Sequence, residues 1–168
     1  MTGVSAQTQV VFSGTYAARA RSTGTPTYAI ATLGHDASTV TYEARLRVES
    51  QVKNRNATLL AVRTSSGAPV VTLYRTGNGR LGLRNHVTST NTNSNVSVPL
   101  RAWHRVMLRV VVGGAQGRTE VSLNGTSIPA LTKDVSTGLT PIRKVQIAET
   151  ASSTSHDFYF DDVSVVFT

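Results

Sequence analysis

Hydrophobic and polar residues alternate one by one along most of this chain, which is the pattern of half-buried β-strands. In residues 41–48 (TYEARLRV), Tyr, Ala, Leu and Val occupy every second position, and polar residues occupy the others. Residues 103–112 (WHRVMLRVVV) repeat the pattern, with Val and Leu on one side and two arginines on the other. No segment has an amphipathic helical period over three turns. The chain is therefore predicted to be all-β.

The remaining predicted strands are short and separated by clusters of Gly, Pro, Asn and Ser. They cover residues 14–19, 26–33, 58–63, 70–75, 80–84, 118–123, 143–149 and 156–167. The Asn-Gly pairs at 78–79 and 124–125 are strong hairpin signals. Residues 88–97 (TSTNTNSNVS) are wholly polar at first, and we expect an exposed loop that runs into a short strand. About a dozen antiparallel strands predict a two-sheet jelly-roll sandwich, in preference to a closed barrel.

Length and composition restrict the class of protein further. The 168 residues suit a single domain, residues 1–168, and the absence of cysteine excludes disulfides and thiolate-based sites. No apolar run reaches the roughly 18–20 residues that span a bilayer. The N-terminus lacks the basic-then-apolar layout of a secretory signal, so we expect that an export signal has been removed or lies upstream. These features exclude a membrane-spanning protein and a disulfide scaffold.

The chain is basic, and most of its positively charged residues are arginines. Seventeen Lys+Arg against nine Asp+Glu give a formal net charge of +8. Arginine's planar guanidinium suits bidentate contact with carboxylate, sulfate or phosphate. The arginines recur singly along the predicted strands, so they form either a solvated face or an anion-binding stripe. Nucleic acid is not favoured as a partner, because the basic residues are not gathered into a run.

Motifs typical of enzymes are absent or incomplete. Residues 77–82 (GNGRLG) match the dinucleotide pattern, but they join two strands where that chemistry needs the start of a helix. No two acidic residues are two apart, so no strand supplies the carboxylate pair of a glycosidase. There is no G-x-S-x-G elbow, and the four histidines lack metal-ligand spacing. The leading expectation is therefore a protein that is not an enzyme.

Two local features match part of a known functional motif or metal site. Arg118-Thr-Glu120 resembles a strand motif of alginate lyases, but the Gln-Ile-His strand that accompanies it reads Gln146-Ile-Ala148 here, and we interpret the match as coincidence. Asp161 and Asp162 are the densest acidic cluster of a basic chain. We expect these two carboxylates either to pair with arginine or face solvent, or to bind a structural Ca²⁺, an ion that prefers oxygen ligands.

Several segments together resemble the laminin-G-like domains of the concanavalin A-like lectin/glucanase superfamily. Residues 102–110 (AWHRVMLRV) with 119–125 (TEVSLNG) are similar to one hairpin of these domains, and residues 73–83 (LYRTGNGRLGL) are similar to the hairpin before it. Residues 158–165 (FYFDDVSV) are similar to the closing strand of many secreted carbohydrate-binding jelly rolls. The resemblance implies two curved sheets, sugar or protein recognition outside the cell, and often a calcium ion. Such modules often start with a strand that carries an acidic calcium ligand, and we expect that this strand is absent from residues 1–168.

The leading hypothesis is a secreted, non-catalytic carbohydrate-binding module for an anionic or branched polysaccharide. The alternatives are an extracellular adhesion or assembly module that binds protein, and a glycosidase or polysaccharide lyase with an atypical site. Sugar recognition needs aromatic platforms and forked polar groups. The outward-facing strand residues that meet this need are the predicted ligand-binding set: Arg45, Arg47, Tyr74, Arg75, Arg84, Arg105 and Arg109.

Overall fold

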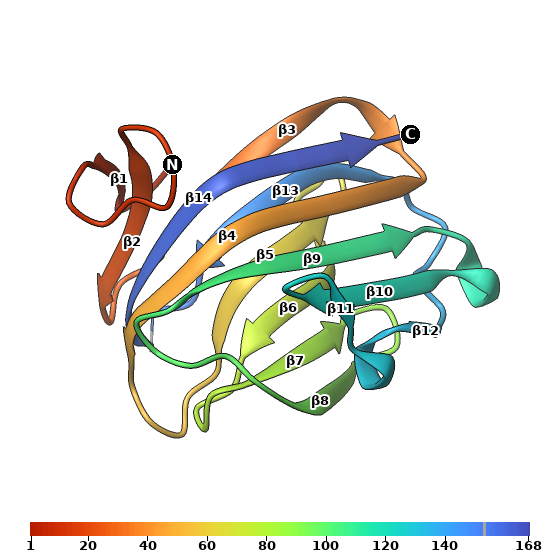
Figure 1. Ribbon diagram of the computed structural model, residues 1–168. Helices are drawn as coiled ribbons and strands as arrows, with labels where there is room; N and C mark the ends of the chain where they lie inside the picture. The colour runs from red at the N-terminus through yellow and green to blue at the C-terminus, as the bar shows by residue number, and fades with distance from the viewer. Residues whose placement is uncertain (153) are drawn as a thin grey trace.

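The computed structural model describes residues 1–152 and 154–168 and consists of two antiparallel sheets packed face to face (Figure 1). We call the eight-stranded one sheet I. Its strands lie in the order β1 (Val4–Gln7), β2 (Ala17–Thr23), β14 (Ser155–Phe167), β4 (Thr39–Gln51), β9 (Trp103–Val111), β10 (Arg118–Leu123) and β11 (Thr126–Ser127), and β12 (Lys133–Asp134) pairs with β10.

We call the six-stranded one sheet II. It follows the order β3 (Thr27–Ala37), β13 (Ile142–Glu149), β5 (Ala57–Arg63), β6 (Pro69–Arg75), β7 (Arg80–Asn85) and β8 (Thr90–Ser97). Two single-turn 3₁₀ helices, η1 (Gly114–Gln116) and η2 (Pro129–Leu131), are the only helices in the described part of the chain. None of the described helices is long and apolar enough to cross a membrane. The predicted all-β, two-sheet sandwich is confirmed.

The core lies between the sheets and follows the alternation of the sequence. On β4, Tyr42, Ala44, Leu46 and Val48 are buried, whereas the residues between them are partly exposed and face outward. The largest fully buried side chains come from both sheets and include Tyr42, Leu46, Leu59, Leu60, Leu73, Leu81, Leu83, Leu108, Phe158 and Phe160. Each sheet therefore presents one apolar face to the core and one polar face to the surroundings.

Two predicted boundaries differ from the structure for physical reasons. The polar segment expected to begin as a loop is mainly strand, because residues 90–97 form β8 and pair with β7. This strand lies at the edge of sheet II and is mostly exposed, so its sequence lacks the alternation of a strand with one buried face. The first predicted strand, residues 14–19, begins only at Ala17.

The G-x-G-x-x-G match is a hairpin, as predicted. Residues 76–79 connect β6 to β7, and Gly79 has a φ of 89°, a conformation that glycine adopts without strain. Gly82 lies within β7, opposite Tyr74 of β6 and Asn93 of β8. No described helix follows this glycine-rich segment, so it has none of the geometry of a dinucleotide site.

Candidate active site

The strand register of sheet II brings polar side chains from distant parts of the chain onto one outer face. Gln146 of β13 is opposite Ala61 of β5, which is opposite Thr72 of β6. Thr72 is in turn opposite Arg84 of β7, which is opposite Asn91 of β8. Directly paired residues of antiparallel strands project to the same side of a sheet. This row therefore crosses the outer face of sheet II almost from edge to edge.

A pocket of about 310 Å³ lies over this row. Its wall is polar and carries two guanidinium groups, one imidazole, one phenol and one carboxylate. We call it the Arg63 pocket, and it is lined by Asn56, Thr58, Arg63, Pro69, Thr72, Tyr74, Arg84, His86, Asn91, Gln146, Glu149 and Thr150. Side chains capable of proton transfer and of binding an anion thus share one hollow.

Arg63 is held at one end of the pocket by neutral partners only. Its Nε donates to Oε1 of Gln146 at 2.5 Å, and one of its terminal nitrogens donates to the Gly67 carbonyl at 2.7 Å. Its other terminal nitrogen is 3.5 Å from the Thr150 hydroxyl. Burial lowers the pKa of Arg63, and the nearby charge of Glu149 partly opposes this shift. A guanidinium stays charged in proteins, so Arg63 offers an oriented positive charge to the pocket.

His86 follows β7 directly and is half-buried beside the two pocket arginines. Its Nε2 lies 2.9 Å from the Thr72 hydroxyl. Nδ1 makes no hydrogen bond to any residue that the structure describes. Burial lowers the pKa of His86, and the positive charges of Arg84 and Arg63 lower it further. The imidazole is therefore kept neutral at neutral pH, which is the state a proton acceptor needs.

Tyr74 extends from β6 across β7 toward β8. Its hydroxyl donates to Oδ1 of Asn93 at 2.8 Å, and the ring lies over Gly82, where a Cβ would overlap it. Burial raises the pKa of Tyr74, and the charge of Arg84 opposes the shift. Tyr74 is therefore protonated at neutral pH and can donate a proton.

Glu149, the only carboxylate of the Arg63 pocket, has a structural role. Oε2 accepts hydrogen bonds from the backbone N–H and the hydroxyl of Thr58, and Oε1 accepts from the Ala151 N–H. Ala148, just before it, has a φ of 61°, which interrupts the strand alternation at this point. Its carboxylate oxygens are thus already used to join the ends of β5 and β13.

The outer face of sheet I differs from this pocket because acidic residues neutralise most of its arginines. Arg105 pairs with Glu43 at 2.7 Å, and Arg47 pairs with Glu49 at 3.0 Å. Arg63 and Arg84, in contrast, have no carboxylate within ion-pair distance in the described residues 1–152 and 154–168. The Arg63 pocket therefore carries positive charge without a paired carboxylate, whereas three of the six predicted arginines, Arg47, Arg105 and Arg109, are neutralised by carboxylates.

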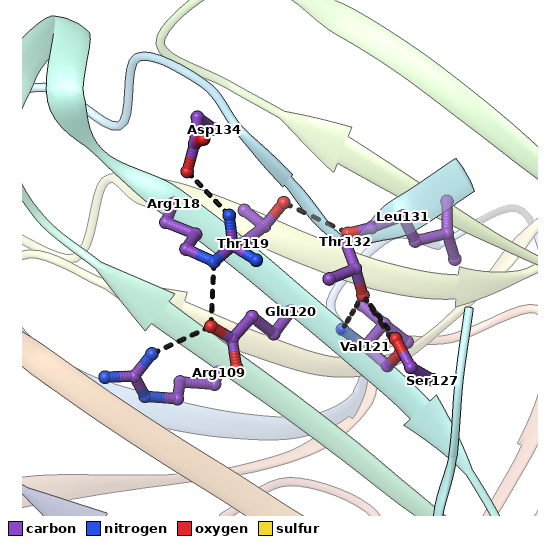
Figure 2. A network of polar contacts seen from close by, with 9 residues as sticks. All are labelled: Arg109, Arg118, Thr119, Glu120, Val121, Ser127, Leu131, Thr132 and Asp134. Atoms are coloured by element: carbon purple, nitrogen blue, oxygen red, sulfur yellow. Dashed lines mark hydrogen bonds and ion pairs between the residues drawn. The ribbon is translucent and has the colours of Figure 1, made fainter. Parts of the chain in front are cut away.

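The Arg118-Thr-Glu120 triplet belongs to this compensated face and not to the pocket. Figure 2 shows Glu120 between two arginines: its Oε1 accepts from Arg109 at 3.0 Å and from Arg118 at 2.8 Å. Arg118 also pairs with Asp134 at 2.7 Å. The triplet thus lies on sheet I, away from the Arg63 pocket. Gln146, from the other half of that motif, does lie in the Arg63 pocket.

Arg45 lies beneath the N-terminal loop. Its guanidinium is 4.3 Å from the centre of the Phe12 ring, which also makes an edge contact with Trp103. Trp103 faces outward on β9, opposite Arg47. The loop that carries Phe12 thus covers part of the outer face of sheet I.

Asp161 and Asp162 hold this loop. Oδ2 of Asp161 accepts from the backbone N–H groups of Phe12 and Ser13 at 2.8 and 3.1 Å, and its Oδ1 accepts from the Asp162 N–H at 2.8 Å. Asp162 accepts from the Ser13 hydroxyl. These oxygens face N–H and O–H donors, an environment that suits a carboxylate without a metal. No group of three or more potential metal ligands occurs among the described residues. The aspartate pair does not fit a calcium site as it stands, and calcium binding stays a prediction.

The structure therefore separates the predicted ligand-binding residues into three groups. Tyr74 and Arg84 line the Arg63 pocket. Arg75 is buried and donates to the Val98 carbonyl and to Gln51, so it joins loops at one end of the sandwich. The remaining four lie on the outer face of sheet I: Arg45, Arg47, Arg105 and Arg109.

Sequence analysis missed Arg63, His86 and Gln146 as site residues. Arg63 and Gln146 occupy outward positions of predicted strands, so their orientation was available from the alternation. Their proximity was not available, since it depends on the pairing of β13 with β5. His86 lies just past the end of β7, and no spacing rule marked it.

Comparison with known proteins places the fold among polysaccharide-related structures. No family model and no curated protein matches the chain. Among solved structures, it is similar to cellulose induced protein Cip1, with a TM-score of 0.78 at 17% identity over 98% of this chain and 85% of Cip1. It is also similar to the endo-β-1,4-glucuronan lyase of the fungus Trichoderma reesei, with a TM-score of 0.75 at 17% identity over 98% and 87% of the two chains.

A third similar structure is the alginate lyase PA1167 of Pseudomonas aeruginosa. Its TM-score is 0.59 at 16% identity, over 79% of this chain and 66% of that one. At identities this low, the structural similarity establishes the fold and nothing more. The concanavalin A-like jelly roll that the sequence resemblance implied is thereby confirmed.

The leading functional hypothesis requires correction. Both the expectation of a non-catalytic module and that of a protein that is not an enzyme are contradicted by the similarity to polysaccharide lyases. The arginines, tyrosine and histidine of the pocket come from β5, from β6, and from β7 with the residue that follows it, so no single local motif contains all of them.

Proposed function

We propose that this protein is a polysaccharide lyase that cleaves a uronic-acid polymer by β-elimination in the Arg63 pocket. The observation that carries the proposal is the convergence of Arg63, Arg84, His86 and Tyr74 in one hollow. The names of two similar structures, a glucuronan lyase and an alginate lyase, support a uronate as the substrate class.

Elimination from a uronate begins by weakening the bond between C5 and its proton. The adjacent carboxylate resists removal of this proton until its negative charge is neutralised. Arg63 and Arg84 supply that charge, and the carboxamide of Gln146 orients Arg63. Hydrogen-bond donors already fixed in position stabilise the extra charge that develops on the carboxylate in the transition state.

His86 is assigned as the base. Thr72 accepts a hydrogen bond from Nε2–H in this tautomer, which leaves the Nδ1 lone pair to take the C5 proton. The electron pair of the broken C5–H bond forms a C4=C5 double bond, and the C4–O4 bond breaks. The departing O4 takes a proton from the Tyr74 hydroxyl, so atoms and charge balance. The products are a shortened chain and a chain with an unsaturated uronate at its new end.

The single carboxylate of the pocket favours elimination over hydrolysis. Glycoside hydrolysis commonly needs two carboxyl groups on opposite sides of the scissile bond. Glu149 is the only one that lines the Arg63 pocket, and its oxygens are bonded to Thr58 and Ala151. We further propose that the activity is extracellular, because polymeric substrates do not enter cells intact.

Ultraviolet absorbance of the unsaturated product tests the proposal. Purified protein is incubated with polyglucuronate, alginate or polygalacturonate, and we expect absorbance to rise with at least one of them. His86→Ala and Tyr74→Phe should each lower kcat by about a hundredfold or more, the usual loss on removing a general base or acid. Arg118→Gln, on the opposite face, is the matched control and should retain the rate. Absence of product from every polyuronate, or full activity of both pocket variants, would overturn the assignment.

A further inference from the structure

A second hollow of about 360 Å³ lies next to the Arg63 pocket. We call it the Asn93 groove, and it is lined by Asn54, Asn56, Thr76, Gly77, Asn78, Arg80 and Asn93. Asn56 lines both hollows. Tyr74, which lines the pocket, is hydrogen-bonded to Asn93, which lines the groove. The two hollows are therefore neighbours that meet at the Tyr74–Asn93 pair.

The chemistry of the Asn93 groove suits a sugar with an acidic group. Four carboxamides line it, and each offers both donors and acceptors of the kind that bind hydroxyl groups. Arg80 is its only charged lining residue. Among the described residues, Arg80 has no carboxylate partner, and its hydrogen bond goes to the neutral Asn95 at 3.0 Å. An exposed guanidinium of this kind is available to an anion.

β7 sets the distance between the charges of the two hollows. Arg80, Gly82 and Arg84 occupy alternate positions of this strand, and Arg80 and Arg84 are both exposed. A strand rises about 3.3 Å per residue, so their backbones lie about 13 Å apart. Gly82 between them has no side chain, and the Tyr74 ring lies over it. One extended ligand can therefore contact both guanidinium groups and the phenol that separates them.

We infer that the Asn93 groove is a second uronate-binding site, in which Arg80 binds a carboxylate of the same polymer whose reacting sugar lies in the Arg63 pocket. The inference rests on the proposed function for the identity of the polymer. Because both hollows must be filled for full affinity, a long polyuronate binds better than a disaccharide, which fills the Arg63 pocket alone. Recognition of two carboxylates on one chain also favours continuous polyuronates over polymers with isolated acidic sugars.

A binding experiment that does not depend on turnover tests the inference. Calorimetric affinities for polyglucuronate and for its disaccharide are measured on the His86→Ala background, which slows cleavage and leaves the Tyr74–Asn93 hydrogen bond in place. We expect Arg80→Gln to weaken polymer binding about tenfold, the loss of one charge-assisted contact, and to leave disaccharide binding unchanged. The matched control is Arg21→Gln, which also removes an exposed positive charge, from β2 of the other sheet. Arg21→Gln should leave both affinities unchanged.

Each result supports or overturns the inference. Equal losses of polymer affinity in Arg80→Gln and Arg21→Gln would show that only net charge matters, which overturns the inference. Equal losses of polymer and disaccharide affinity in Arg80→Gln would place Arg80 in the Arg63 pocket, which also overturns it. Polymer binding that does not respond to Arg80→Gln also overturns it, as does tighter binding to single-stranded DNA than to polyuronate. Failure of the proposed function is distinguishable, because wild-type protein would then bind the polymer through Arg80 and release no unsaturated product.

Discussion

The hydroxyl of Tyr74 on β6 donates a 2.8 Å hydrogen bond to Oδ1 of Asn93 on β8, and the intervening strand is crossed at Gly82. Residues separated by 19 positions thus hold the phenol over the centre of sheet II. A glycine at this position is required by packing, because any Cβ there would overlap the ring atoms of Tyr74. The placement of the proposed proton donor therefore depends on the absence of a side chain.

Gly82→Ala tests this dependence. The added methyl group must displace the Tyr74 ring, so we expect kcat/KM on polyuronate to fall at least tenfold, with an unfolding free energy lower by about 1–3 kcal/mol. Gly34→Ala is the control, because a Cβ at Gly34 meets nothing within 4 Å. Circular dichroism checks that both variants are folded. Unchanged activity in Gly82→Ala would contradict the assigned role of the ring.

The activity should depend on pH through His86. Its pKa is lowered from 6.5 by burial and by Arg84 and Arg63, so the imidazole is neutral, and active as a base, above that lowered value. We expect kcat/KM to be lost as pH falls, with the midpoint of the acidic limb below 6.5. Arg84→Gln removes one of the causes and should move this midpoint upward. A midpoint above 6.5 in the wild type, or a midpoint that Arg84→Gln leaves in place, would argue against His86 as the base.

Folding stability should fall in mildly acidic solution because of His156. This side chain is 2% exposed and stacks on Phe158, and neither ring nitrogen makes a hydrogen bond of standard geometry to the described residues. Burial lowers its pKa, and the Thr154 backbone and nearby carboxylates oppose the shift. The unfolded state therefore binds a proton more readily than the folded state, so stability is fully present above about pH 6.5 and decreases below it.

Urea unfolding at about pH 8 and about pH 5 measures this effect. His156→Phe keeps an aromatic ring beside Phe158 but cannot titrate, so its stability should change less between the two pH values. His104 is also buried with a lowered pKa and contributes in the same direction, so some pH dependence will remain. An unchanged pH dependence in His156→Phe would contradict the prediction.

Asp161→Ala should release the N-terminal loop from sheet I. The carboxylate accepts the Phe12, Ser13 and Asp162 N–H groups, and losing the bonds to one charged acceptor costs about 1–3 kcal/mol. Chemical denaturation measures the loss, and faster hydrogen exchange at Phe12 and Ser13 locates it. Asp162→Ala, whose contact to Ser13 is exposed, should cost less. A rise in melting temperature when Ca²⁺ is added to EDTA-treated protein would instead support the calcium prediction.

The architecture could be predicted because its causes are local. Alternation in residues 41–48 and 103–112 determines which side chains face the core, and the Asn-Gly pair at 78–79 determines a hairpin. The polar edge strand β8 was partly missed for the opposite reason. Both of its faces are mostly exposed, so nothing in its composition distinguishes it from a loop.

The sequence by itself determined that outward-facing arginines would be numerous, and the tertiary structure alone decided which of them are free. Arg105 is neutralised by Glu43, 62 positions away, whereas Arg63 meets the neutral Gln146, 83 positions away. Both outcomes follow from the order and register of strands, which depend on how two whole sheets cover a common core. The alternation of a single strand carries no information about its neighbour, so the site emerges only when the strands are paired.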